Sequence, residues 1–344
     1  MKTSFPRHEL QAATAAALAL WLTALVANGH TTEPRELSIA HDEYVYMIRF
    51  SPDGKTVATA AGDNVARVWN WSSQELLHTL QHDSAVYGAV FAPGGNMIAT
   101  GSGEGEVALW NAANGKLVAK QKEHADAIYC LSFAPDGRTL ATIGGDGKKG
   151  DTRCRIWSIP NFRIENVLPG HDRPGYGVLF GPTVGKARPL VTSGGDKLIH
   201  IYDGNVADSL ANSVTDSRVT LKGHTSDVYR CCFSPTGEQL ASTSQDGTVR
   251  IWNVVAAGPS RTIFKSRDPT YDVAYSADGR LIAAVGDDGF VRFWNTETYE
   301  LVGEFKVDKE GLYSVVFTPD QANVLTGGVR GKIYACPVPK IDAQ

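Results

Sequence analysis

The stretch Phe233–Asn253, FSPTGEQLASTSQDGTVRIWN, decides the fold of this chain. It contains two short runs in which apolar and polar residues alternate, and turns rich in glycine, proline and aspartate join them, as expected for half-buried antiparallel strands. The stretch Phe50–Asn70, FSPDGKTVATAAGDNVARVWN, repeats the same pattern. The sequence therefore predicts a fold that is built from repeated units of short strands.

A tyrosine marks the period of this repeat. It stands four positions before the aromatic residue that opens the pattern, as Tyr229 stands before Phe233. Successive tyrosines are 41 to 53 residues apart, and no helical period of useful length follows residue 30. A spacing of this size indicates a repeat architecture. The seven tyrosines are Tyr46, Tyr87, Tyr129, Tyr176, Tyr229, Tyr271 and Tyr313.

Other positions recur together with the tyrosine. A histidine stands nine residues before the aromatic residue in the first five units, an acid stands thirteen residues after it in most units, and a tryptophan usually follows. On these residues the chain resembles the WD40-repeat family over roughly residues 35–336. The resemblance implies an all-β fold in which each unit is a four-stranded antiparallel blade and seven blades close into a β-propeller.

The resemblance also implies how the ring closes and which residues stabilise each blade. An N-terminal strand would complete the last blade, and Arg35–Ala40 is the candidate, so that residues 30–344 form the propeller with a C-terminal tail. A histidine, a hydroxyl residue, an aspartate and a tryptophan would form a hydrogen-bonded network, which makes their burial tolerable. We expect these histidines to be structural, and not bases or metal ligands. The complete sets are His41, Thr59, Asp63 and Trp69; His124, Thr142, Asp146 and Trp157; and His224, Ser242, Asp246 and Trp252.

The sixth and seventh units depart from this pattern. Ser266 and Ala284 replace the histidine and the hydroxyl residue of unit six. Unit seven has Asp308 in the histidine position, Arg330 in the acid position and Cys336 in the tryptophan position. We expect packing to be the main force that holds these two blades.

By the same resemblance, the seven tyrosines lie at the mouth of the central channel. They form either an aromatic plug or the floor of a binding site, and we favour the binding site. The loops that lead into the tyrosines carry acids, among them Asp126, Asp227 and Asp268. Because a cation gains about 0.5–2 kcal/mol over an aromatic face, we expect a protein partner that presents arginine or lysine.

Composition narrows the function. The net charge of −4 gives no bulk attraction to nucleic acid, so no nucleic-acid partner is expected. The five cysteines show no zinc-site spacing, and we expect no metal and no cofactor. No convergent nucleophile or phosphate loop indicates an enzyme. The sequence favours a non-catalytic interaction platform, with a receptor for a small cationic ligand as the alternative and an enzyme as a weaker one.

The N-terminus differs from the repeats. Lys2 and Arg7 precede an uncharged run at residues 12–27, and the small residues Ala27 and Gly29 stand at its end and just after it. This is the pattern of a signal peptide over residues 1–29. The run of 16 residues is short for a bilayer-spanning helix, which needs ~20, so we favour cleavage near His30 over a permanent anchor or a short helix packed on the domain. The expected location is the periplasm, the exterior or the outer side of a membrane, and the cytoplasm if the segment is no signal.

Overall fold

The computed structural model describes residues 33–145, 151–183, 189–203, 219–254 and 258–341. Within these ranges all regular structure is β-strand, and they hold no helix that could span a bilayer. Two sequence-based expectations lie outside the described residues: the apolar segment at residues 1–29, with its possible helix, and the network role of Asp146.

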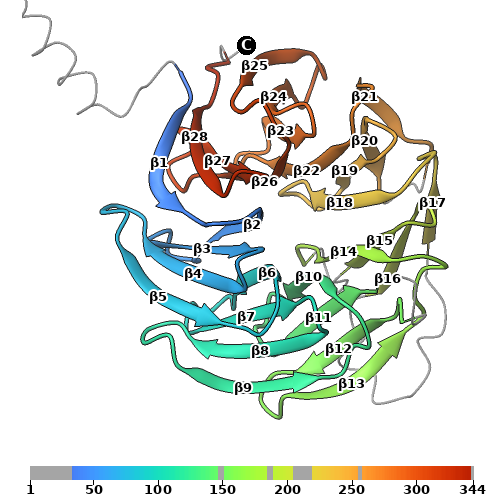
Figure 1. Cartoon of the computed structure of the whole chain (residues 1–344). Helices are drawn as coiled ribbons and strands as arrows, with labels where there is room; N and C mark the ends of the chain where they lie inside the picture. The colour runs from blue at the N-terminus through green and yellow to red at the C-terminus, as the bar shows by residue number, and fades with distance from the viewer. Residues whose placement is uncertain (1–32, 146–150, 184–188, 204–218, 255–257, 342–344) are drawn as a thin grey trace, which may run out of the picture.

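Seven antiparallel four-stranded sheets surround a central axis as the blades of a propeller (Figure 1). This confirms the all-β, seven-bladed fold. Blades 1 to 3 comprise β2 (Val45–Phe50), β3 (Thr56–Ala61), β4 (Val65–Asn70) and β5 (Leu76–Gln81); β6 (Val86–Phe91), β7 (Met97–Ser102), β8 (Glu106–Asn111) and β9 (Leu117–Lys122); and β10 (Ile128–Phe133), β11 (Thr139–Gly144), β12 (Cys154–Ser158) and β13 (Arg163–Leu168).

The remaining blades repeat this order, and the last one takes its fourth strand from the other end of the chain. Blades 4 to 7 comprise β14 (Gly175–Phe180), β15 (Pro189–Gly194), β16 (Leu198–Asp203) and β17 (Val219–Lys222); β18 (Val228–Phe233), β19 (Gln239–Ser244), β20 (Thr248–Asn253) and β21 (Arg261–Lys265); β22 (Thr270–Tyr275), β23 (Leu281–Gly286), β24 (Phe290–Asn295) and β25 (Leu301–Lys306); and β26 (Leu312–Phe317), β27 (Asn323–Gly328), β28 (Lys332–Pro337) and β1 (Arg35–Ala40).

The closing strand is the one that the sequence predicts. β1 lies beside β28 in Figure 1 and pairs with it in antiparallel register, Arg35 opposite Ala335 and Ala40 opposite Lys332. Leu37 and Ile39 point inward and are buried. The first and last strands of the propeller are therefore held together by a backbone ladder and by apolar burial, which removes two open sheet edges.

Alternating residues of each strand supply the core between the blades. One buried cluster joins Val191 and Ile199 of blade 4 to Val228, Leu240 and Trp252 of blade 5. Neighbouring blades thus share one apolar layer, which fixes their angle around the axis. The inner strands of all seven blades then face the same channel (Figure 1).

Candidate functional site

Each inner strand carries a β-bulge at its tyrosine. In β18 the register with β19 shifts between Val228 and Arg230, so Tyr229 is the extra residue of the ladder. The same shift occurs at the tyrosine of the other six inner strands. A bulge bends its strand and re-aims side chains. It therefore turns both the tyrosine and the residue that follows it toward the channel, whereas in a regular strand these two would point to opposite faces.

The seven tyrosines form a closed aromatic ring, which we call the cup. Every tyrosine contacts the next one around the axis, with ring centroids 4.7 Å apart for Tyr46 and Tyr87 and 6.0 Å apart for Tyr313 and Tyr46. Together with Arg230 they line a cavity of about 230 Å³. Tyr44 extends the ring outward, because it packs on both Tyr46 and Tyr313. The phenols are half-buried, so the cup is open at one end.

The cup is electrically neutral at its wall and acidic at its mouth. The hydroxyl of Tyr271 donates a hydrogen bond of 3.3 Å to Asp287, and the carboxylate of Asp227 lies beside Tyr176. Burial, assisted by these carboxylates, raises the pKa of Tyr229 to about 12. Burial also raises the pKa of the phenols of Tyr46, Tyr87, Tyr176, Tyr271 and Tyr313. These phenols stay protonated at neutral pH and act as hydrogen-bond donors.

The three acids that the sequence singled out have different positions. Asp227 lies at the mouth, beside Tyr176 and Tyr229. Asp126 is largely buried, with 7% of its surface exposed. Asp268 is exposed. Its backbone N–H, and not its carboxylate, donates a hydrogen bond to the Ser266 hydroxyl.

The acid that does stand beside several phenols is Asp287, which sequence reasoning missed. Its charge acts on Tyr229, Tyr271 and Tyr313. A signal was present, because Asp287 directly precedes the network acid Asp288, and glycine fills that position in the first four units. Glu43 and Glu310 add charge near Tyr46 and Tyr313.

Arg230 forms the floor of the cup and was also missed. It follows Tyr229 on β18, so the bulge aims it into the channel. Its guanidinium crosses to blades 3 and 4, where it donates hydrogen bonds to the backbone carbonyls of Tyr176 and, at 3.0 Å, of Tyr129. The residues that follow the other six tyrosines carry no positive charge, which is the sequence signal for an unusual role.

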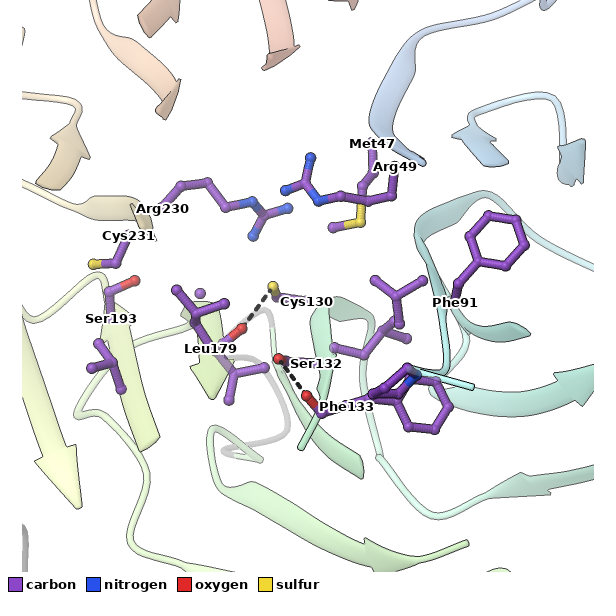
Figure 2. A pocket seen from close by; sticks show the side chains of 16 residues that line it. Met47, Arg49, Phe91, Cys130, Ser132, Phe133, Leu179, Ser193, Arg230 and Cys231 are labelled. Carbon is purple, nitrogen blue, oxygen red and sulfur yellow. Dashed lines mark hydrogen bonds between the residues drawn. The ribbon is translucent and has the colours of Figure 1, made fainter. Parts of the chain in front are cut away.

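Beneath the cup lies a second cavity of about 210 Å³, which we call the lower chamber. Figure 2 shows the guanidiniums of Arg49 and Arg230 pointing toward each other across it. Arg49 lies 3.7 Å from the carboxylate of Asp272, which is buried and held by the backbone N–H groups of Val273 and Val315. Two cations and one carboxylate leave this part of the channel with a net positive charge.

Thiol chemistry finds no support in the lower chamber. Burial raises the pKa of Cys231 to about 12 and that of its neighbour Cys232 to about 11, so neither is a thiolate at neutral pH. The Cys130 thiol donates to the backbone carbonyl of Val178 at 3.4 Å. The channel offers groups suited to binding: aromatic faces and phenol donors in the cup, and two guanidiniums in the lower chamber.

The histidine networks join the second and third strands of a blade to the loop that leads into its inner strand. In blade 5 the Trp252 indole donates to the Ser242 hydroxyl at 2.8 Å, and His224 joins that hydroxyl, at 2.7 Å, to the carboxylate of Asp246, at 3.0 Å. Because a carboxylate can only accept, His224 donates from Nδ1 and its Nε2 accepts from the serine. The corresponding contacts in blade 1 join Trp69, Thr59, His41 and Asp63.

In blades 2 and 3 the described residues place an acid other than the one at the expected spacing beside the histidine network. In blade 3, Trp157 and His124 contact Thr142 as expected, but Asp151 supplies the carboxylate: it accepts from the backbone N–H of Ala125 and pairs with Arg155 at 2.9 Å. The Asp151 carboxylate lies 3.9 Å from His124 Nδ1, and Asp146 lies outside the described residues.

In blade 2, Glu106 lies 3.3 Å from His82, while Glu104 pairs with Lys122 at the surface. The longer glutamate side chain reaches the histidine from the strand itself.

Comparisons with known proteins agree with this architecture. The family model described as WD domain, G-beta repeat matches residues 34–70, 74–111, 115–158, 215–253 and 258–295, which is more than half of the chain. Similar curated proteins are Periodic tryptophan protein 2 of Arabidopsis thaliana (30% identical over 115 residues, 33% of this chain and 11% of that protein), Coronin-7 of Mus musculus (34% over 109 residues, 30% and 11%) and Protein transport protein sec13 of Emericella nidulans (36% over 91 residues, 26% and 28%).

These similarities concern the repeat more than the whole proteins, because the matched stretches span between 11% and 28% of the length of the three relatives. The family model and the seven four-stranded blades lead to the same assignment. The chain belongs to the WD40 family.

Proposed function

We propose that the chain is a non-catalytic protein-interaction platform and that its cup receives an arginine- or lysine-bearing segment of a partner protein. The observation that carries this proposal is the closed ring of seven tyrosines, each in contact with its neighbours. Tyrosine combines a large contact area with few rotatable bonds, which suits recognition. A side chain that enters the ring would meet several aromatic faces at once.

The charges at the mouth favour a basic segment. Asp227 and Asp287 lie beside the phenols and are partly or fully exposed, so they attract a cation to the aromatic faces. Arg230 limits how deep that cation enters, because its guanidinium lies beneath the ring. A cation is therefore stable at the mouth and unstable in the lower chamber. This favours a peptide segment that rests on the rim over a small cation enclosed in the channel.

A peptide series tests the charge preference. Peptides that carry no other charge and have one central arginine, lysine, glutamine or glutamate are titrated onto the full chain. We expect arginine and lysine to bind best, and Tyr87→Ala/Tyr229→Ala to weaken their binding by about 1–3 kcal/mol, in the range of aromatic anchors. Val118→Ala is the matched control, because Val118 is 58% exposed on the outer strand β9.

Three results would decide against this site. If the glutamate peptide binds best, the channel recognises anions through Arg230. If the double variant unfolds, the cup is a structural plug. If it folds and binds the basic peptides unchanged, the partner site lies elsewhere.

We also propose that residues 1–29 direct export of the chain. The basic start and the uncharged run support this reading. N-terminal sequencing of the native protein is expected to begin near His30, and an intact Met1 on soluble cytosolic protein would contradict it.

A further inference from the structure

Blade 4 differs from the other blades at one network position. His200 of β16 stands opposite Thr192 of β15. In blades 1, 3, 5 and 6 the residue at the position of His200, on the third strand of the blade, is an arginine. These residues are Arg67, Arg155, Arg250 and Arg292. A permanent cation is thus replaced by an imidazole in blade 4 alone among these five blades.

This replacement brings two imidazoles to one carboxylate. His171 Nδ1 lies 2.8 Å from one oxygen of Asp196, and His200 Nε2 lies 4.0 Å from the other. The two rings are 4.8 Å apart between centroids, and the three potential ligand atoms all lie within 4.8 Å of one another. Among the described residues, this is the group of histidine, cysteine and acid side chains whose spacing could hold a metal ion.

The far nitrogen of each ring is held by a hydroxyl. His171 Nε2 lies 3.0 Å from Thr192 Oγ1, and His200 Nδ1 lies 3.0 Å from Thr220 Oγ1. Such outer contacts orient the rings of metal-binding histidines and select their tautomer. They direct the near nitrogens, His171 Nδ1 and His200 Nε2, toward Asp196.

We propose that His171, Asp196 and His200 bind a divalent transition-metal ion such as Zn²⁺. Two imidazoles and one carboxylate with a water molecule are a donor set that such ions accept. Bonds of about 2.0–2.1 Å place ligand atoms about 3.4 Å apart in a tetrahedral site. The imidazoles therefore have to approach each other slightly. His200 can do so, because 16% of its side chain is exposed and the ring is not fully enclosed.

The proton balance is satisfied within the site. Unmetallated His171 donates its Nδ1 proton to Asp196. On coordination the metal ion takes the place of that proton at Nδ1, and His171 carries its proton at Nε2 instead, exchanged through solvent. The Nε2–H group then donates a hydrogen bond to Thr192 Oγ1. In the blades with a complete network the same hydroxyl receives an indole N–H. Here residue 202 is a tyrosine, whose hydroxyl donates to the carbonyl of Pro169 at 3.2 Å, so Thr192 has a lone pair available.

Blades 1, 3 and 6 disfavour a metal ion at the corresponding place. In blades 1, 3 and 6 the arginine already pairs with the network acid, at 2.6 to 2.9 Å. It would compete with a metal ion for the carboxylate and oppose its charge. The replacement of arginine by His200 removes this competitor and adds a ligand.

Cobalt titration of the full-length, metal-free chain without a histidine tag tests the site, because Co²⁺ reports its ligands through visible absorption bands. We expect one equivalent to bind and Zn²⁺ to displace it. His200→Arg, which restores the residue of four other blades, and the smaller His200→Gln are each expected to weaken binding about 100-fold or more, since even outer-shell changes cost 10–100-fold. His78→Ala, on the outer strand β5, is the control for weak binding by a lone histidine.

Thermal melts with and without Zn²⁺ separate loss of metal binding from loss of folding, because each variant is compared with itself. Zn²⁺ is expected to raise the melting temperature of the unaltered chain and of His78→Ala. It is expected to leave the melting temperatures of both His200 variants unchanged. The proposal is overturned if the unaltered chain shows no saturable binding, or if either folded His200 variant binds Co²⁺ as tightly as the unaltered chain.

Discussion

Blade 5 and blade 7 pair their inner three strands in the same register, yet they bury different polar groups. In blade 5, Trp252, Ser242, His224 and Asp246 form one continuous chain of hydrogen bonds. In blade 7, Asp308 fills the histidine position, where it accepts from the hydroxyl of Tyr334 at 2.8 Å and lies 3.8 Å from Arg330. In blade 7 the acid thus stands at the histidine position and the basic residue at the acid position, each in a loop between two strands.

The difference teaches that the backbone ladder and apolar packing form a blade, whereas the network refines it. Blade 7 keeps four paired strands although Cys336 replaces the tryptophan. Packing was expected to be the main force in this blade, and Asp308, Tyr334 and Arg330 add a polar set to it. Within the described residues, Thr326 Oγ1 remains buried without a hydrogen-bond partner. Blade 6, which also lacks the histidine, keeps a charged set, because Arg292 pairs with Asp288 and with Glu304.

Removing the closing strand should affect blade 7 most strongly. A chain that begins at His41 lacks Leu37 and Ile39, whose burial contributes roughly 3–6 kcal/mol together, and it loses the ladder to β28. We expect the cooperative thermal transition to broaden or vanish. A chain that begins at Thr31 is the control, and identical melts for the two chains would show that β1 does not close the ring.

Removing one buried hydroxyl from blade 5 and one from blade 7 compares the polar interiors of these two blades directly. Ser242→Ala leaves both the Trp252 indole and the His224 ring without a buried partner, at about 1–3 kcal/mol per group. Thr326→Val removes a hydroxyl that has no partner in the part of the chain that the structure describes, so we expect a change within about 0.5 kcal/mol. Denaturant unfolding measures both, and equal losses would mean that the network adds nothing specific to blade 5.

Acid should weaken the blades that contain histidine networks. Burial lowers the pKa of His41 and His224, so only the unfolded chain gains these protons as the pH falls below about 6.5. The free energy of unfolding therefore decreases toward low pH. Burial by itself would raise the pKa of Asp246, but hydrogen bonds from His224 and Thr248 hold it well below its usual range, which extends the loss below pH 4.

A pair of variants assigns this pH dependence. His224→Gln should flatten the slope between pH 7 and pH 5 by at most about 1.4 kcal/mol per pH unit, the value for one proton. Tyr334→Phe in blade 7 should leave the slope unchanged, because burial and Asp308 raise the pKa of Tyr334 above its ordinary value near 10. Equal slopes for the unaltered chain and His224→Gln would exclude this histidine as a source.

The smallest effect is expected at the edge of blade 7. Lys332 and Glu36 form an ion pair of 2.6 Å between β28 and β1, and both side chains are exposed. Exposed pairs contribute about 0–1 kcal/mol. Glu36→Gln should therefore change stability by less than about 0.5 kcal/mol, and raised salt should remove even that difference. A larger loss would show that closure depends on charge as well as on Leu37 and Ile39.

Local repetition explains what sequence reasoning could predict. The alternation in Phe233–Asn253 and its counterparts defines strands and turns within one unit, because each hairpin forms between residues close in the chain. A tyrosine at the position of Tyr229 in every unit predicted that all seven tyrosines lie at the mouth of one channel. It did not predict that a bulge would aim Arg230 into that channel. The Asp126 carboxylate lies buried for a similar reason, because its exposure depends on how the loops of neighbouring units pack.

By itself the sequence determined the number of units, the all-β blades, the closing strand and most members of the histidine networks, since each follows from a pattern repeated within about 40 residues. Only the tertiary structure decided what meets on the axis and in blade 4. Arg230 reaches the carbonyl of Tyr129 across 101 residues of chain, and the backbone N–H of Ile48 reaches the Ser314 hydroxyl across 266. Closing the ring brings such residues together, and no spacing within one unit encodes that closeness.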